Sequence, residues 1–114
     1  MNNIIVLKSK HFALRIIKLY KYLNSEKHEY ILSKQVLRSG TSIGANVKEA
    51  TRAQSRADFF SKLNIALKEA SETEYWLELL YESDYITEKQ FNSIFPENQE
   101  IISILVSITK HQKQ

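Results

Sequence analysis

The segment that most constrains the fold spans residues 38–50 and reads RSGTSIGANVKEA. It has the character of a helix interior, yet it contains Gly40 and Gly44, the two glycines of the sequence. Each glycine costs a helix interior about 1 kcal/mol relative to alanine, so a structural reason is needed. Small residues four positions apart let a second backbone come close, and Ser39, Ser42 and Ala45 enlarge the smooth patch. We therefore expect this segment to form the inner helix of an antiparallel bundle.

The composition favours a single helical domain over residues 1–114. With two glycines and one proline, the sequence has too few of the residues that favour tight turns for an all-β protein. The absence of cysteine excludes a disulfide scaffold, a zinc–thiolate site and a thiol nucleophile. The apolar runs at residues 4–7 and 101–108 are shorter than the roughly 20 residues of a membrane span, and the first residues lack the basic start of a signal peptide. We expect a soluble, cytoplasmic protein that does not enter a membrane.

The first two helices are recognised by their apolar spacing. The first is expected to begin near Ser9 and to end at a turn over residues 24–28, and the second to run from residue 29 or 30 to Arg52. On a helical wheel, a sector of about 60° on the second helix forms its inner seam. This seam consists of Leu32, Val36, Ser39, Ile43, Asn46 and Ala50. The opposite face carries Lys34, Arg38, Lys48 and Arg52. The glycines lie on a flank between the two faces, where another helix can approach.

The third helix is expected to start at the capping pattern Ser55-x-x-Asp58 and to run to about Glu82. Two apolar seams compete on it. One contains Phe60, Leu63, Leu67, Ala70, Glu74, Leu77 and Tyr81, and the other contains Phe59, Leu63, Ala66, Ala70, Thr73, Leu77 and Leu80. An unpaired buried charge costs several kcal/mol, so we favour the second seam and place Glu74 outside the core. Trp76, Tyr75 and Tyr81 exceed what a small bundle needs for its own core, which suggests a subunit contact.

The fourth helix is expected to open at a second capping pattern, Thr87-x-x-Gln90. Pro96 lacks an N–H group and clashes with the preceding turn, so we predict a kink or short break over residues 92–96 and a helix that resumes near Glu97. Four amphipathic helices joined by short turns predict an all-α, up-down-up-down antiparallel four-helix bundle.

Residues 37–47 read LRSGTSIGANV and are followed by Glu49 and Ala50. This run resembles the central motif of a four-helix-bundle family first noticed as open reading frames in intervening sequences of 23S rRNA genes. The likeness extends through residues 12–20 and most of residues 54–86. It implies a left-handed bundle that assembles as a homo-oligomer, typically a pentameric ring, and it carries over no catalytic residues. The family is similar to accessory proteins of diversity-generating retroelements, which are associated with nucleic acid and a reverse transcriptase. The chain departs from the family pattern at Lys48, Thr51, Ser71 and Pro96.

The charge of the chain is unevenly distributed. Residues 1–68 carry 13 Lys and Arg against 4 Asp and Glu, a net charge of +9, whereas residues 69–114 carry 3 against 9, a net charge of −6. One part of such a molecule could bind polyanions and another could bind its own copies or a basic partner. Alternatively, oppositely charged helices are simply neighbours within the bundle.

The basic stripe is the candidate nucleic-acid-binding site, and it consists of Lys34, Arg38, Lys48, Arg52, Arg56 and Lys62. Repeated around a ring, it would bind phosphate backbone without reading sequence, although a solvated helix face is the commoner meaning of such a stripe. A second polar set comprises Ser39, Asn46, Glu49, Glu69 and Glu72. We interpret this set as a hydrogen-bonded structural layer that fixes helix register, with general acids or di-metal ligands as the alternative.

No metal site, cofactor or small-molecule substrate is expected, because the three histidines are scattered and nucleotide-binding and hydrolase motifs do not occur. The leading hypothesis is a non-enzymatic homo-oligomer that binds RNA or DNA, or a nucleoprotein partner, through its basic face. The second hypothesis is a protein-interaction scaffold in which basic and acidic halves meet between subunits.

Overall fold

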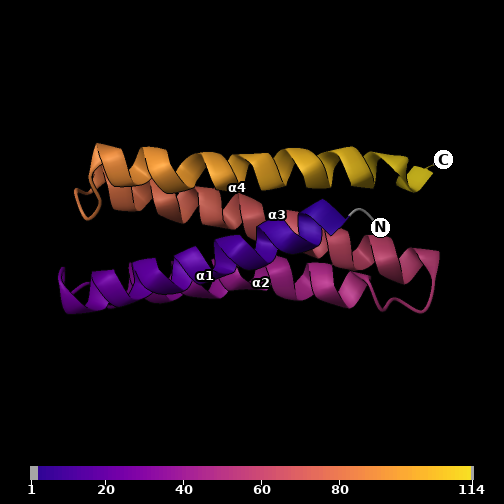
Figure 1. Ribbon diagram of the computed structural model, residues 1–114, viewed down its shortest axis with the longest axis horizontal. Coiled ribbons are helices and arrows are strands. Elements are labelled where there is room, and N and C mark those ends of the chain that lie inside the picture. The colour runs from indigo at the N-terminus through magenta and orange to yellow at the C-terminus, as the bar shows by residue number, and fades with distance from the viewer. Residues whose placement is uncertain (1–2, 114) are drawn as a thin grey trace.

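The computed structural model describes residues 3–113 and shows four long antiparallel helices followed by a short terminal turn. The elements are α1 (Asn3–Ser25), α2 (Leu32–Ala50), α3 (Arg56–Glu82), α4 (Glu88–Thr109) and the 3-10 helix η1 (Lys110–Lys113). The helices lie side by side along a body of 46 × 20 × 19 Å, with the start of α1 and the end of α4 at the same end of the bundle (Figure 1). The predicted all-α four-helix bundle is therefore confirmed.

The two glycines allow α1 to lie directly against α2. A Cβ atom added to Gly40 would lie 2.8 Å from Cγ1 of Ile16, and one added to Gly44 would lie 3.2 Å from the backbone oxygen of Ser9. Both glycines belong to one continuous helix. The expected close approach is confirmed, and the neighbour that makes it is α1.

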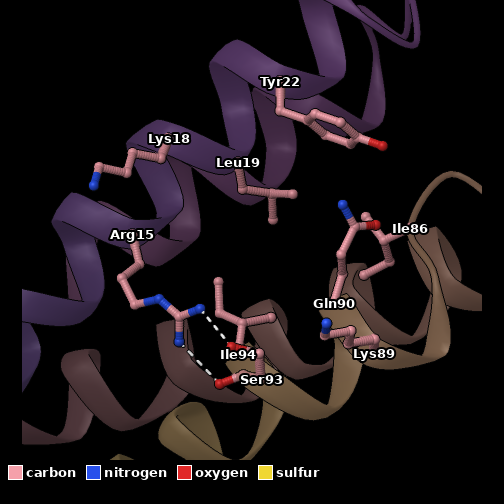
Figure 2. Close-up of a pocket in the computed structure, with 9 residues that line it drawn as sticks. All are labelled: Arg15, Lys18, Leu19, Tyr22, Ile86, Lys89, Gln90, Ser93 and Ile94. Carbon is pink, nitrogen blue, oxygen red and sulfur yellow. Dashed lines mark hydrogen bonds between the residues drawn. The ribbon is translucent and has the colours of Figure 1, made fainter.

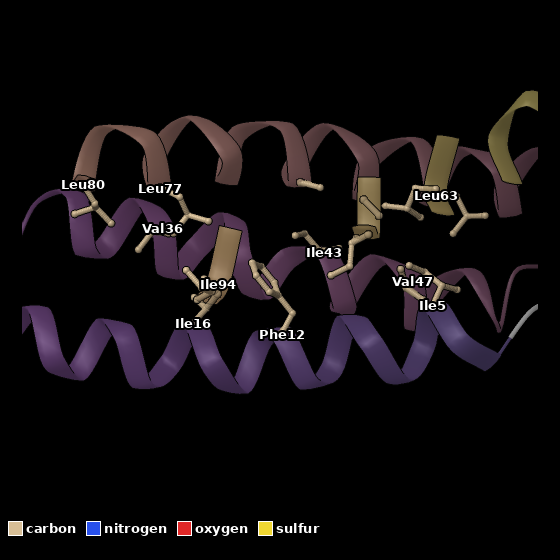
Figure 3. Packing of buried hydrophobic residues seen from close by; sticks show 14 of the residues in the cluster. Ile5, Phe12, Ile16, Val36, Ile43, Val47, Leu63, Leu77, Leu80 and Ile94 are labelled. Carbon is tan, nitrogen blue, oxygen red and sulfur yellow. The ribbon is translucent and has the colours of Figure 1, made fainter. Parts of the chain in front are cut away.

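Buried aliphatic side chains from all four helices fill the space between them (Figure 3). On α3 the preferred seam is confirmed at Leu63, Ala66, Ala70, Thr73, Leu77 and Leu80, which are all buried. At the start of this seam Phe60 is buried in place of Phe59. Glu74 remains outside the core, where its Oε1 accepts a hydrogen bond of 2.7 Å from Nε2 of Gln99.

The predicted start of the first helix at Ser9 is wrong, because α1 begins at Asn3. Ser9 is buried at 1% exposure, and its hydroxyl donates to the carbonyl of Val6 instead of capping a helix. A capping residue lies just before the first turn of its helix. Ser9 cannot have this role, because Ile5 is already a fully buried residue of the same helix.

The second helix is shorter than predicted and spans Leu32–Ala50. Its start is set by Glu29, whose carboxylate accepts hydrogen bonds from the backbone N–H groups of Ile31 and Ser33 at 3.3 and 2.8 Å. A carboxylate in this position satisfies amide groups that have no partner within the helix, and it complements the helix dipole.

The predicted caps of α3 and α4 are confirmed. Ser55 accepts a hydrogen bond from the backbone of Asp58, and Thr87 and Gln90 form a complete capping box. The predicted break at Pro96 is wrong, because α4 continues through it. Pro96 and Asn92 are both exposed, so water can solvate the carbonyl that the proline leaves without a helical partner.

Candidate nucleic-acid interface

The residues of the basic stripe lie on α2, on the first turns of α3 and in the loop between them. Lys34 and Lys48 are 14 residues apart on α2, a separation of about 21 Å along the helix axis. All members are exposed except Lys62, which is partly buried. The structure therefore spreads these cations along the bundle, and their local partners decide which of them are available to a ligand.

Arg38, in the middle of the stripe, is held by two carboxylates of α3. Its Nη1 lies 3.1 Å from Oε2 of Glu69, and its Nη2 is hydrogen bonded to Glu72. The Glu69 side chain is only 14% exposed, so the guanidinium compensates a carboxylate that is largely withdrawn from water. Arg38 thus joins α2 to α3, and the two carboxylates compensate its charge.

The basic residues near the α2–α3 loop form a second group. A groove of about 480 Å³ lies there and is lined by Ala45, Lys48, Glu49, Arg52, Gln54, Asp58 and Lys62. We call it the α2–α3 groove. Three cations and two carboxylates face it, and Arg56 lies one turn away at the start of α3. The groove therefore has a small net positive charge.

The carboxylates of the α2–α3 groove are partly engaged. Oε1 of Glu49 lies 3.5 Å from Nζ of Lys62, and Oδ2 of Asp58 accepts a hydrogen bond of 3.3 Å from the backbone N–H of Gln54. Lys48 and Arg52 form no ion pair among the described residues. These two side chains are the cations of the groove best able to meet a phosphate.

Arg56 is held in a fixed position beside the groove. The central carbon of its guanidinium lies 4.8 Å from the centre of the Phe60 ring, and its Nη2 donates a 2.8 Å hydrogen bond to the carbonyl of His111. Such a cation–π contact holds the guanidinium in one orientation. Arg56 therefore adds a positioned positive charge near the end of the bundle.

The residues of the predicted polar layer fall into separate groups. The hydroxyl oxygens of Ser39 and Thr73 are 2.8 Å apart in a buried hydrogen bond between α2 and α3. Asn46 donates to the carbonyl of Ser42 within its own helix. The three glutamates are bound to the stripe, with Glu69 and Glu72 on Arg38 and Glu49 on Lys62. The glutamates of the predicted polar layer thus lie beside the basic stripe and compensate part of its charge.

Ion pairs between neighbouring helices compensate much of the charge asymmetry. Lys8 pairs with Glu100, Arg15 pairs with Glu97, and Arg38 pairs with Glu69 and Glu72. Each of these contacts joins the basic N-terminal part to the acidic C-terminal part. The structure therefore supports the interpretation that oppositely charged helices are neighbours. The cations best able to bind an external anion are those outside these pairs.

Over residues 3–113, no three His, Asp or Glu side chains are grouped so that they could hold a metal ion. Over the same range, no helix combines the length and apolar character needed to cross a bilayer.

Comparison with known proteins places the chain in a family. The sequence model described as 23S rRNA-intervening sequence protein matches residues 1–107. A solved structure, described as a protein of unknown function from the S23 ribosomal protein family of Bacteroides thetaiotaomicron, is 60% identical and has a TM-score of 0.93. The match covers 95% of this chain and 96% of that one. No curated protein matches the sequence. The glycine-containing helix, the four-helix architecture and this match together show that the chain belongs to the 23S rRNA-intervening sequence protein family.

Proposed function

We propose that this protein is a non-enzymatic, homo-oligomeric helical bundle that binds the phosphate backbone of RNA or DNA, or a nucleoprotein partner. The observation that carries the proposal is the grouping of Lys48, Arg52 and Lys62 around the α2–α3 groove. Arg56 adds a fourth charge beside it. These side chains come from two helices and a loop, so they form a surface instead of a single helical stripe.

The proposed binding does not read sequence. Lysine and arginine that meet phosphates displace condensed counterions, so affinity falls as salt rises, with a slope of about 0.7 per contact for single strands and about 0.9 for duplex DNA. A chain that contributes three or four contacts is a weak binder by itself. Repetition around a homo-oligomer raises the number of simultaneous contacts and therefore the avidity.

We test the proposal by gel-shift titration of a structured RNA with the groove variant Lys48→Gln/Arg52→Gln and with the matched variant Lys10→Gln/Lys21→Gln on α1. Both variants remove two exposed lysine or arginine charges, but only the first removes them from the groove. We expect the groove variant to lose at least about tenfold in affinity and the matched variant to lose much less. Equal losses for both variants, or no binding by the unmodified protein, would contradict the proposal.

A second candidate function is a protein-interaction scaffold, and exposed apolar side chains favour it. Leu7 and Leu14 on α1 are 68% and 56% exposed, and Tyr75 on α3 is 54% exposed. Nε1 of Trp76 is buried without a hydrogen-bond partner among the described residues, although a buried indole N–H normally has one. A second subunit packed on this part of α3 could cover Tyr75.

Light scattering distinguishes self-association through the aromatic surface of Tyr75 and Trp76 from self-association through contacts between basic and acidic halves. If the aromatic surface is the contact, Tyr75→Glu lowers the measured mass and Lys68→Glu, at another exposed position on α3, leaves it unchanged. If basic and acidic halves meet between subunits instead, the mass of the unmodified protein falls at high salt.

A further inference from the structure

A pocket of about 380 Å³ lies between α1 and the N-terminal half of α4. We call it the α1–α4 pocket (Figure 2). It is lined by Arg15, Lys18, Leu19, Tyr22, Ile86, Lys89, Gln90, Ser93 and Ile94. Contacts between α1 and α4 are sparser than those between the other adjacent helices, which leaves room for the pocket.

The floor of the pocket is apolar and held in place. Ile86 and Ile94 are 3% and 5% exposed, and Figure 2 shows Leu19 and Tyr22 projecting from α1 toward them. Ile86 is fixed by the turn before α4, where its backbone N–H donates to the carbonyl of Leu80 at 3.3 Å. A floor of this kind favours a ligand with an apolar part, because binding removes that part from water.

The rim of the pocket is cationic, and no carboxylate lines it. Arg15 donates to the carbonyl and hydroxyl oxygens of Ser93 at 2.9 and 2.8 Å and also pairs with Glu97, which compensates its charge. Lys18 and Lys89 are exposed and form no ion pair among the described residues. Because a lysine ammonium lies on a flexible stem, both can turn toward an anion at the rim.

The start of α4 adds an oriented donor to this rim. Oε1 of Gln90 accepts a 2.8 Å hydrogen bond from the backbone of Thr87, which fixes the amide group. Figure 2 shows the amide nitrogen of Gln90 on the side of the pocket that faces Tyr22. The same residues belong to the first turn of α4, where the helix dipole favours negative charge.

From these features we propose that the α1–α4 pocket binds a small organic anion, with a carboxylate or phosphate head on a compact apolar body. The apolar body would lie on Leu19, Ile86 and Ile94, and the head would meet Lys18, Lys89 and Gln90. The volume lies within the range of about 300–1,000 Å³ typical of ligand pockets. The proposal goes beyond the proposed function, because it concerns different helices and a different kind of ligand.

Methyl NMR of the full chain, labelled at Ile and Leu, tests the proposal with octanoate, octanol and inorganic phosphate as probes. We expect octanoate to shift the methyl signals of Leu19, Ile86 and Ile94 in a saturable manner. Octanol, which lacks the charge, should bind about tenfold more weakly, and phosphate, which lacks the apolar body, should leave these methyl signals in place.

Charge variants show whether the lysines of the rim select the anion. In Lys18→Gln/Lys89→Gln we expect octanoate and octanol to bind alike, whereas the matched variant Lys10→Gln/Lys34→Gln should keep the preference. Near-UV circular dichroism checks that both variants are folded. Equal binding of octanoate and octanol by the unmodified protein, shifts centred elsewhere, or no saturable shift would overturn the proposal.

Discussion

The contact between Gly40 and Ile16 shows how one missing methyl group sets the distance between two helices. Two side-chain carbons of Ile16, Cγ1 and Cγ2, lie 2.8 and 2.9 Å from the position that a Cβ on Gly40 would occupy. Ile16 is fully buried, so it cannot turn away without disturbing its neighbours. The glycine is therefore retained at a position where helix propensity alone would favour alanine.

A double-mutant cycle tests this account at the residue scale. We expect Gly40→Ala to lower the free energy of unfolding by about 1 kcal/mol, because overpacking outweighs the gain in helix propensity. In an Ile16→Ala background the clash is gone, and the same substitution should raise the free energy of unfolding by up to about 1 kcal/mol. Urea unfolding of the four proteins measures both values. The same sign in both backgrounds would contradict the account.

Arg38 also illustrates what one residue contributes through its partners. We expect Arg38→Gln to lower the free energy of unfolding by about 1 kcal/mol, because Glu69 and Glu72 lose their cation and Glu69 is largely buried. Lys34→Gln on the same helix should change it by no more than a few tenths of a kcal/mol. Urea unfolding again provides the measurement. An equal effect of the two substitutions would show that the ion pairs around Arg38 are not structural.

At the scale of the elements, α4 is a continuous helix that contains a residue which normally interrupts one. Pro96 lies within it, and Asn92 loses a helical hydrogen bond as a result. On the adjacent turns Ser93 and Glu97 are both held by Arg15 of α1. These contacts from α1 support the turns on either side of the proline.

Replacement of Pro96 measures what the helix loses by containing it. We expect Pro96→Ala to raise the free energy of unfolding by about 1–3 kcal/mol, since it restores the N–H donor and removes a ring at an exposed position. Ser103→Ala, at another exposed position of α4, reports the effect of helix propensity alone and should give about 0.5 kcal/mol or less. Thermal and urea unfolding of both variants provide the comparison. A gain no larger than that of Ser103→Ala would show that the proline is accommodated without cost.

At the scale of the whole molecule, most of the fold could be predicted and most of the candidate site could not. Apolar spacing identified the buried seam of α3, and the side-chain caps Ser55 and Thr87 placed the starts of two helices. Both signals are local. The partners of Arg38 lie more than 30 positions away in the sequence, and the α1–α4 pocket joins residues about 70 positions apart. No local pattern encodes such a pairing, because it depends on which helix faces are adjacent in the bundle.

The charge distribution of the whole molecule likewise depends on which helices are adjacent in the bundle. The net charges of +9 and −6 in the two parts of the sequence suggested two oppositely charged surfaces. In the fold, ion pairs that involve Lys8, Arg15 and Arg38 join the two parts across helix boundaries. Lys48 and Arg52, which line the α2–α3 groove, lie outside these ion pairs.

The most direct test of nucleic-acid binding through the α2–α3 groove is the salt dependence of affinity for a single-stranded RNA. Fluorescence anisotropy between about 50 and 200 mM salt gives the slope of log affinity against log salt. If Lys48 and Arg52 meet phosphates, Lys48→Gln/Arg52→Gln reduces that slope by about 1.4 for each chain engaged, whereas Lys10→Gln/Lys21→Gln leaves it nearly unchanged. A slope that is the same for the unmodified protein and for the Lys48→Gln/Arg52→Gln variant would contradict the proposed function.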